Sequence, residues 1–170
     1  MRKPSKGVTS VVAVLVLTAV AGGVLSRSLL HSGATRAPAT QGNVLMLFNQ
    51  IRTAHGLHRL RGDTRLADAA TSHSVDMLRR GYFAHDGPQG TFSVRIRRYV
   101  RSGSEAAEIL SFGGGVYATP AGMVKAWMAS PAHRRIILLP ELRSVGFGVA
   151  TGTYHGSTGV AMATADFSSS

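Results

Sequence analysis

The chain has 170 residues, which is enough for one domain of ordinary size and a short extension. It contains no cysteine, so a disulfide framework, a thiolate metal site and a cysteine nucleophile are excluded. The formal net charge is +11, yet the Arg residues are scattered and only 6% of residues are aromatic, a pattern that does not predict a nucleic-acid binder. The charge instead predicts a solvated basic face with a modest attraction for anionic wall polymers or lipid headgroups.

The N-terminal segment has the pattern of an export signal. "MRKPSK" carries three positive charges, and "GVTSVVAVLVLTAVAGGVL" follows as an uncharged run of 19 residues with a small-residue site at positions 19–21. A run of roughly 18 or more apolar residues can also span a bilayer, so residues 1–26 are either a cleaved signal peptide or an uncleaved signal-anchor. Both interpretations predict an extracellular location or one on the outer face of the cytoplasmic membrane. Removing residues 1–21 would leave 16 Lys and Arg against 8 Asp and Glu, a net charge of +8.

Residues 27–42 are rich in Ser, Thr, Gly and Pro and predict a linker, which places a single domain at residues 43–170. A first amphipathic helix begins near Asn43, and Gly56 can close it. Its inward side would carry Leu45, Phe48, Ile51 and, less clearly, Arg52. A second helix begins at an N-cap, Asp63 or Thr64, and stops at Gly81. Its buried stripe would consist of Leu66, Ala70, His73 and Met77.

The second half of the domain mixes helices with strands. A short helix is predicted from Thr91, an extended segment over "EAAEILSFGGG", and a helix over "TPAGMVKAWMAS", with Thr119 as its cap and Pro120 in its first turn. The period then changes to strict alternation in "SVGFGVATG" and "TGVAMATADF", which the turn "TYHGS" joins into a β-hairpin. Helices followed by late strands indicate an α+β fold with an antiparallel sheet.

Three titratable side chains lack an obvious structural role in these elements. His85 lies in a turn-rich loop after the second helix, and His133 follows a Ser-Pro break. Glu108 stands in an apolar run, where a carboxylate is costly to bury unless it is paired. Ser130 is predicted to cap the next helix, the alternative being a serine nucleophile activated by His133. Tyr82 would either line a cleft beside His85 or pack in the core.

The segments that carry these residues resemble a known family. "LFNQIRTAHGL", "AATSHSVDMLRRGYFAHDGP", "EILSFGGGVYATP", "AWMASPAHRRIIL", "LRSVGFGVATG" and "ATADF" are similar to successive landmarks of the bacterial SCP-like extracellular proteins. These proteins belong to the CAP superfamily of cysteine-rich secretory and pathogenesis-related proteins. The resemblance covers about residues 44–167. It implies a three-layer α-β-α sandwich with a central antiparallel sheet.

The resemblance also implies a cleft with a tetrad of two histidines and two acids. His85 in "YFAHDGP" matches the first histidine, His133 in "SPAHR" matches the second, and Glu108 matches the glutamate of a Gly-Glu-Asn landmark. The flanking Gly and Asn are replaced here by Ala107 and Ile109. Where animal and plant members have the second acid, this chain has a serine, as is common in bacterial members.

We expect an extracellular binding module whose ligand is unknown, with a lipid or a cell-wall component as the candidate classes. The expected cleft consists of His85, Glu108, His133, Ser130 and Tyr82. The alternative is a peptidase or esterase that depends on a divalent metal, zinc or another ion, held by His85, Glu108 and His133. Without metal, Glu108 would hydrogen-bond both imidazoles and only brace the sheet. No residue is assigned a catalytic role, and membrane contact is expected only through an uncleaved N-terminal segment.

Overall fold

The computed structural model of the chain describes residues 10–14 and 37–170. The predicted signal or anchor and the predicted linker therefore lie largely outside the described residues. No helix within the described ranges is long and apolar enough to cross a membrane. The elements are β1 (Ser10–Val14), α1 (Ala37–Ala54), β2 (Arg61–Gly62), α2 (Thr64–Arg80), α3 (Phe92–Ile96), β3 (Ala106–Gly113), a 3-10 turn η1 (Gly115–Ala118), α4 (Pro120–Ala129), α5 (Pro131–Ile137), β4 (Ser144–Tyr154) and β5 (Ser157–Ser168).

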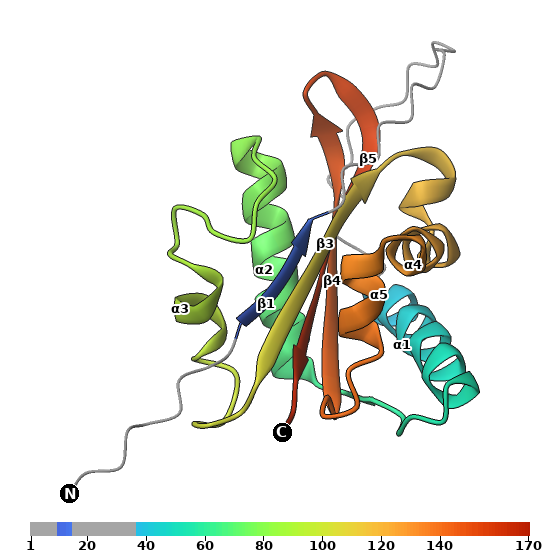
Figure 1. The fold of residues 1–170 in the computed structure, drawn as a ribbon. Coiled ribbons are helices and arrows are strands. Elements are labelled where there is room, and N and C mark those ends of the chain that lie inside the picture. Colours follow the sequence, from blue (N-terminus) through green and yellow to red (C-terminus); the bar gives the residue numbers. More distant parts are fainter. Residues whose placement is uncertain (1–9, 15–36) are drawn as a thin grey trace, which may run out of the picture.

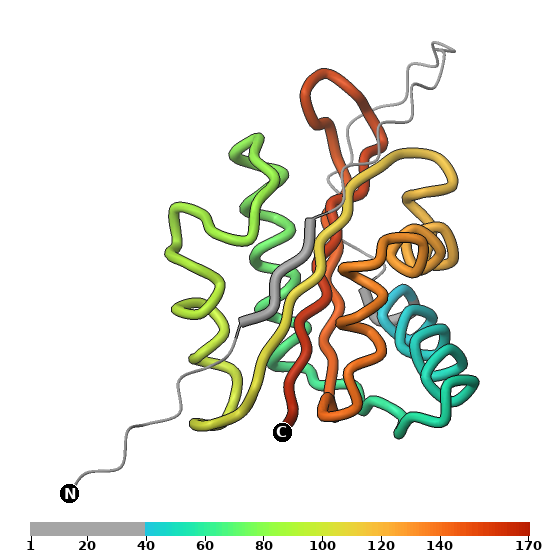
Figure 2. The backbone as a smooth tube through the Cα atoms, viewed as in Figure 1, coloured from blue at the N-terminus to red at the C-terminus, as the bar shows by residue number. Residues whose placement is uncertain are grey.

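The molecule is a three-layer α-β-α sandwich, as predicted. Helices α2 and α3 lie on one face of the central sheet, and α1, α4 and α5 lie on the other (Figure 1). The strand order is β1-β3-β5-β4-β2. Strands β3, β5 and β4 are antiparallel, and their β4–β5 hairpin projects beyond the helices (Figure 2). The two short edge strands, β1 and β2, pair in parallel with β3 and β4 and were not predicted.

The predicted boundaries of α2 and the predicted cap of α4 are confirmed, whereas the predicted start of the first helix near Asn43 is wrong. The side chain of Asp63 accepts hydrogen bonds from the first turn of α2, and Gly81 ends that helix in the left-handed region at φ 70°. Thr119 caps α4 through the backbone N–H of Gly122, at 3.1 Å. Helix α1 begins at Ala37, inside the predicted linker, where Gln41 donates to the carbonyl of Phe147 at 2.8 Å and attaches the first turns to the sheet.

The main hydrophobic core lies between the sheet and the layer of α1, α4 and α5. Trp127 is fully buried there, with ring centroids 5.8 Å from Phe48 and 6.2 Å from Phe147. Ala107 and Ile109 join this core, whereas Ala106 and Leu110 pack with side chains of the α2 and α3 layer. Because side chains alternate along a strand, Glu108 faces the α2 and α3 layer together with its even-numbered neighbours.

Arg52 lies on the inward side of α1, where the sequence placed it less clearly, and so it is not part of the predicted solvated basic face. Its side chain is fully buried, and its guanidinium donates to four backbone carbonyls. The acceptors are the carbonyls of His58, Ile137, Leu139 and Leu142, at 2.8–3.2 Å. The planar fork of arginine thus joins the end of α1 to the segment that follows α5.

We expect Arg52→Lys to lower the free energy of unfolding by about 2 kcal/mol, because an ammonium group cannot reach carbonyls spread around a planar fork. Urea unfolding of the full chain measures this difference. Arg59→Lys, at a neighbouring exposed arginine, serves as the control and should change stability by less than about 0.5 kcal/mol. Equal losses in the two variants would contradict the structural role given to Arg52.

Candidate functional site

Glu108 is the centre of a buried network of charged side chains. Its side chain is fully buried in the middle of β3, where Nδ1 of His85 lies 2.7 Å from Oε1 and Nη2 of Arg95 donates to Oε2 at 2.8 Å. The second hydrogen bond from Nη2 of Arg95 goes to the backbone carbonyl of His85, at 3.1 Å. The carboxylate therefore has the paired environment that its apolar sequence context requires.

The loop from α2 to α3 places His85 and Arg95 over the sheet. Asp86 accepts a hydrogen bond from the backbone N–H of Phe92 at 2.8 Å, and Thr91 caps α3 through Val94. These two contacts set the start of α3, and Arg95 stands in its last turn. Arg95 was not predicted as a site residue, because nothing in its local sequence distinguishes it from the neighbouring arginines.

Asp166 is a second buried carboxyl in the same network. It lies directly opposite Glu108 in the pairing of β3 with β5, and it is fully buried. Within the part of the chain that the structure describes, no N–H or hydroxyl donor reaches its two oxygens, and its side chain interacts with the carboxyl of Glu108. The local sequence of β5 indicates no function for this residue. Only the strand register reveals the pair, since the two acids are far apart in the sequence.

Burial raises the pKa of both carboxyls. Burial raises the pKa of Glu108 to about 7, although the Arg95 guanidinium acts in the opposite direction. Burial and the neighbouring charge of Glu108 raise the pKa of Asp166 well above its usual value. Because Glu108 receives two donors and Asp166 receives none, Asp166 is the carboxyl that holds the proton when the pair shares one.

We expect Asp166→Asn to change the pH dependence of stability. Both carboxyls have raised pKa values in the folded state, so the wild-type chain binds more protons than its unfolded state and loses stability as pH rises through about 7. Relative to wild type, the variant should therefore gain roughly 2 kcal/mol between pH 5 and pH 8. Urea unfolding at several pH values measures this difference.

His73 has the opposite effect on the pH dependence of stability. This effect is the same in Asp166→Asn and in wild type, so it cancels in their difference. Burial lowers the pKa of His73 to about 4, which makes stability rise with pH in both proteins alike. A stability difference between variant and wild type that stays constant from pH 5 to pH 8 would contradict a shared proton on Glu108 and Asp166.

The structure places His133 against Ser130. Nδ1 of His133 lies 2.8 Å from the hydroxyl oxygen of Ser130, and the imidazole is fully buried. The predicted cap is wrong in one respect: Ser130 occupies the N-cap position of α5, but its hydroxyl makes no capping hydrogen bond. The reason is that His133, one turn further on, engages that hydroxyl.

Among the predicted trio, a hydrogen bond joins His85 to Glu108, and a hydrogen bond links His133 with Ser130. Both oxygens of Glu108 are engaged, one of them by a cation, so this arrangement does not fit a divalent ion. No group of three or more His, Asp or Glu side chains in the described ranges could hold a metal. The metal site stays a prediction of the sequence.

Tyr82 and His73 stabilise the loop that carries His85. The hydroxyl of Tyr82 donates to Asp76 at 2.7 Å, and burial together with that hydrogen bond raises the pKa of Tyr82. His73, predicted as a satisfied core histidine, is buried with Nε2 3.0 Å from the carbonyl of Ala84. The low pKa of His73 keeps the ring neutral, so Nε2–H can donate to that carbonyl.

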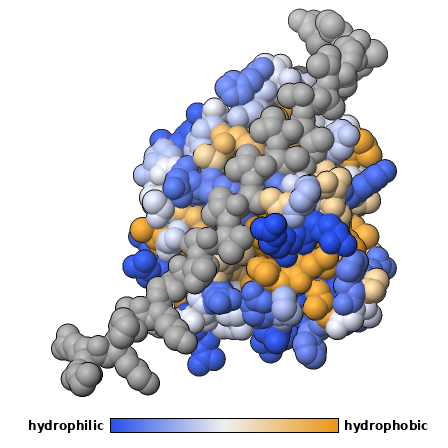
Figure 3. All heavy atoms as spheres, viewed as in Figure 1, coloured by the Kyte–Doolittle hydropathy of each residue, from blue (hydrophilic) through white to orange (hydrophobic). Residues whose placement is uncertain are grey.

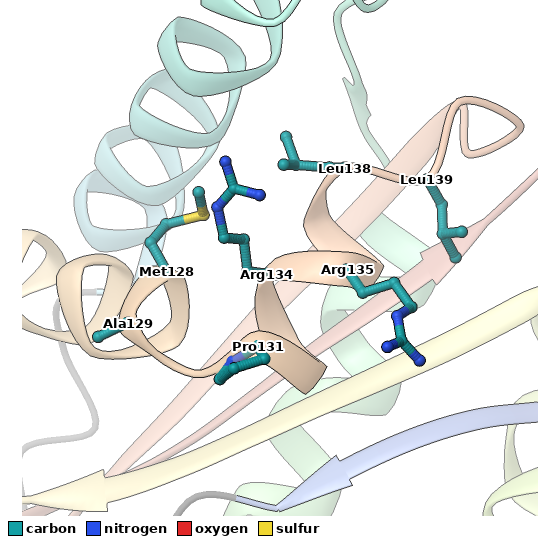
Figure 4. A pocket seen from close by; sticks show the side chains of 7 residues that line it. All are labelled: Met128, Ala129, Pro131, Arg134, Arg135, Leu138 and Leu139. Atoms are coloured by element: carbon teal, nitrogen blue, oxygen red, sulfur yellow. The ribbon is translucent and has the colours of Figure 1, made fainter.

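A separate cavity of about 480 Å³ opens at the junction of α4 and α5. It is lined by Met128, Ala129, Pro131, Arg134, Arg135, Leu138 and Leu139. The two arginines leave α5 in different directions, Arg134 toward Met128 and Arg135 toward the strands (Figure 4). Over α5, strongly hydrophilic side chains lie directly beside an apolar patch (Figure 3). The lining combines apolar walls with two cations and no acid.

Arg134 has a defined position in this cavity. Its Nη2 lies 2.9 Å from Nε2 of His55, and Nδ1 of His55 lies 2.8 Å from the carbonyl of Ile51. A neutral His55 with its proton on Nδ1 satisfies both contacts, donating to the carbonyl and accepting from the guanidinium. The turn that follows α1 therefore holds Arg134 in place at the edge of the cavity.

Comparisons with known proteins give the family of the chain. The sequence profile described as "CAP: Cysteine-rich secretory protein family" matches residues 45–167. The chain is 33% identical over 118 residues to the uncharacterized protein YkwD of Bacillus subtilis, covering 69% of this chain and 45% of that protein. It is 30% identical over 111 residues to the uncharacterized membrane protein YlbC of the same organism, covering 65% of this chain and 31% of that protein.

Solved structures agree with this assignment. An extracellular protein containing an SCP domain from Bacillus anthracis is 28% identical, with a TM-score of 0.62, and the match covers 77% of this chain and 40% of that one. An outer surface protein from Borrelia burgdorferi shares the fold at 19% identity, with a TM-score of 0.63, over 78% of this chain and 96% of that one. The chain spans less than half the length of the two Bacillus subtilis relatives. With the family profile matching residues 45–167, the chain belongs to the cysteine-rich secretory protein (CAP) family.

Proposed function

We propose that this CAP domain is an extracellular binding module of the cell envelope and that its ligand is an anionic amphiphile, such as a fatty acid or an anionic lipid. The observation that carries the proposal is the cavity between α4 and α5, where apolar walls meet Arg134 and Arg135 without a neighbouring acid. Its volume of about 480 Å³ lies in the usual range for small-molecule sites.

The chemistry of the lining supports this ligand class. Leu138, Leu139 and Met128 offer apolar surface to a hydrocarbon chain, and burial of each methylene group contributes about 0.8 kcal/mol. A carboxylate or phosphate would accept hydrogen bonds from the guanidinium of Arg134 or Arg135, in the geometry that arginine favours for such groups. The net positive charge of the chain would draw an anionic ligand or surface toward it.

Binding is favoured over hydrolysis by the state of the buried residues. Both oxygens of Glu108 accept hydrogen bonds, so neither is available to activate a water without rearrangement. The extracellular location rests on the export pattern of the sequence and on the relatives, of which one is an extracellular protein and another an outer surface protein.

The test measures the binding of a fluorescent long-chain fatty acid to the purified full chain. The change in the fluorescence emission of the fatty acid reports binding. We expect micromolar affinity and an approximately ten-fold loss in Arg134→Gln and in Arg135→Gln, equivalent to about 1.4 kcal/mol each. Lys125→Gln is the matched control, because Lys125 is an exposed cation on α4 outside the cavity. It should leave the affinity unchanged.

Two competitors identify the part of the ligand that is recognised. Unlabelled dodecanoate should displace the probe, whereas dodecanol should do so at least ten-fold less well, since it lacks the anionic group. Inorganic phosphate at millimolar concentration tests whether the anion alone suffices, as expected for a wall polymer. Equal displacement by dodecanol and dodecanoate, or equal affinity in all variants, would rule out the proposal.

A further inference from the structure

Four exposed arginines gather where the first turn of α2 meets the end of α3. Arg97, Arg98 and Arg101 follow directly after α3, and Arg65 stands in the first turn of α2. Nη2 of Arg65 donates to the backbone carbonyl of Arg98 at 2.9 Å, which joins the two segments. We call these four residues the α3 arginine patch. Helices α2 and α3 cover one face of the sheet, and the cavity between α4 and α5 lies on the other face (Figure 1).

The positive charges of the patch are not neutralised by neighbouring side chains. In the part of the chain that the structure describes, none of the ion pairs includes an arginine of the patch. Two exposed acids are near in sequence, Asp68 one turn after Arg65 and Glu105 four residues after Arg101, but they form no ion pair with these arginines. Four cations against two acids leave a net positive charge that faces solvent.

The apolar side chains of the same segment are turned toward the protein. Tyr99 and Val100 pack against the buried apolar cluster between α2, α3 and β3. Within α3, Phe92 and Ile96 are buried, and Val94 is the exposed apolar side chain. A membrane-surface helix presents a broad apolar face, and a binder of single-stranded nucleic acid presents aromatic rings on which bases stack. The patch has neither feature, so its chemistry favours a hydrated anionic polymer.

We infer that the α3 arginine patch binds a linear polyanion with phosphodiester groups, as found in cell walls, at a site separate from the cavity between α4 and α5. The planar fork of a guanidinium donates two parallel hydrogen bonds to one phosphate. Successive phosphates of one polymer would meet neighbouring arginines, and each contact after the first is intramolecular, which raises the affinity above that for a single phosphate. The release of counterions from the polymer makes the affinity depend on salt.

The test measures the binding of fluorescently labelled poly(glycerol phosphate) to the purified full chain by fluorescence polarisation at several salt concentrations. The patch variant combines Arg97→Gln, Arg98→Gln and Arg101→Gln and keeps Arg65, which holds the turn after α3. We expect a loss of affinity of about ten-fold or more. The slope of log K against log salt should become less steep by about 2, since each lost phosphate contact of a flexible strand contributes about 0.7.

The matched control removes the same number of charges at other places. It combines Arg59→Gln, Arg79→Gln and Lys125→Gln, all exposed cations outside the patch. Arg79 stands near the end of α2, roughly 21 Å from Arg65 at a helical rise of about 1.5 Å per residue. We expect the control to lose less than about three-fold in affinity, through its lower net charge alone. Equal losses in the control and the patch variant would overturn the inference.

A third variant separates charge from structure. Arg97→Lys, Arg98→Lys and Arg101→Lys together keep the charges but remove the planar forks. This variant should keep the salt dependence of wild type and bind more tightly than the glutamine variant. If it binds as weakly as the glutamine variant, the loss comes from a disturbed structure rather than from lost charge, and the inference is overturned.

Three further measurements distinguish the polymer from other ligands and this site from the cavity. Arg134→Gln should leave polymer binding unchanged, and a loss there in place of a loss at the patch would assign the polymer to the cavity. Vesicles of phosphatidylglycerol at the same phosphate concentration should bind about ten-fold more weakly, because the patch has no apolar face to insert. Single-stranded DNA should bind no more tightly than the polymer. A preference for vesicles or for DNA would overturn the inference. None of these outcomes depends on whether the cavity binds a fatty acid.

Discussion

Replacing Gly148 with Ala is expected to lower the free energy of unfolding by about 3 kcal/mol or more. A Cβ at this position of β4 would collide with the backbone of α2 at Ala70 and Thr71. Gly146, two residues earlier on the same face, is in the same situation with the backbone at Leu66 and Ala67. Backbone cannot rotate away as a side chain can, so the helix would have to leave the sheet.

Urea unfolding of the full chain, with the native α2 amides followed by hydrogen exchange, measures this effect. Gly152→Ala provides the control on the same strand: its Cβ would approach only the flexible end of Leu78, at 3.1 Å. We expect a loss of less than about 1 kcal/mol there. Similar losses at Gly148 and Gly152 would show that α2 does not lie in backbone contact with β4.

The close contact between α2 and β4 also affects the buried site around Glu108. Helix α2 ends at Arg80, and the loop that follows carries His85 to Glu108. The close approach of α2 to β4 therefore sets the height of that loop above the sheet. Ser74 reinforces the approach, since its hydroxyl lies 2.9 Å from Oγ1 of Thr164 on β5.

Glu108→Ala is expected to destabilise the domain by about 4 kcal/mol at pH 7, because it leaves the buried guanidinium of Arg95 without its counter-charge. The arginine would keep only its hydrogen bond to the carbonyl of His85. Urea unfolding measures the loss. Glu108→Gln, which keeps the shape and one acceptor oxygen, should fall between wild type and the alanine variant.

A double variant separates the ion pair from packing. Glu108→Leu combined with Arg95→Met replaces both charges by apolar groups of similar size, and such replacements of buried ion pairs are often close to neutral. We expect the double variant to recover most of the stability lost by Glu108→Ala. If the double variant is less stable than either single change, the network contributes more than mutual neutralisation, and a role of Glu108 in binding would gain support.

The stabilities of the Glu108 single and double variants bear on the cleft that the family resemblance predicts. In this chain Arg95 and Asp166 join the predicted acid and histidine, so that two carboxyls, one guanidinium and one imidazole meet under α3. The raised pKa values of Glu108 and Asp166 favour a proton on this pair, which would reduce the net negative charge that is buried in the cluster. The cavity proposed for the ligand is separate: it lies along α5, on the other face of the sheet.

The sequence by itself determined the local structure of the helices and of the β-hairpin. Asp63, Gly81 and Thr119 act through hydrogen bonds and backbone conformations within a few residues, and the strict alternation after residue 143 defined the β-hairpin. Landmarks in the right order were enough for the family and thereby for the α-β-α sandwich. Such signals can be recognised in the sequence because the residues that interact lie within one helical turn or one strand of each other.

Only the tertiary structure decided which distant groups meet. The pairing of Glu108 with Asp166, the burial of Arg52 against four carbonyls and the seating of residues 10–14 on β3 all depend on strand register and layer packing. Ser130 shows that local patterns can also fail at short range. Its position predicted a helix cap, but its hydroxyl interacts with the side chain of His133 instead. Side-chain partners follow from three-dimensional proximity, which no local pattern in the chain encodes.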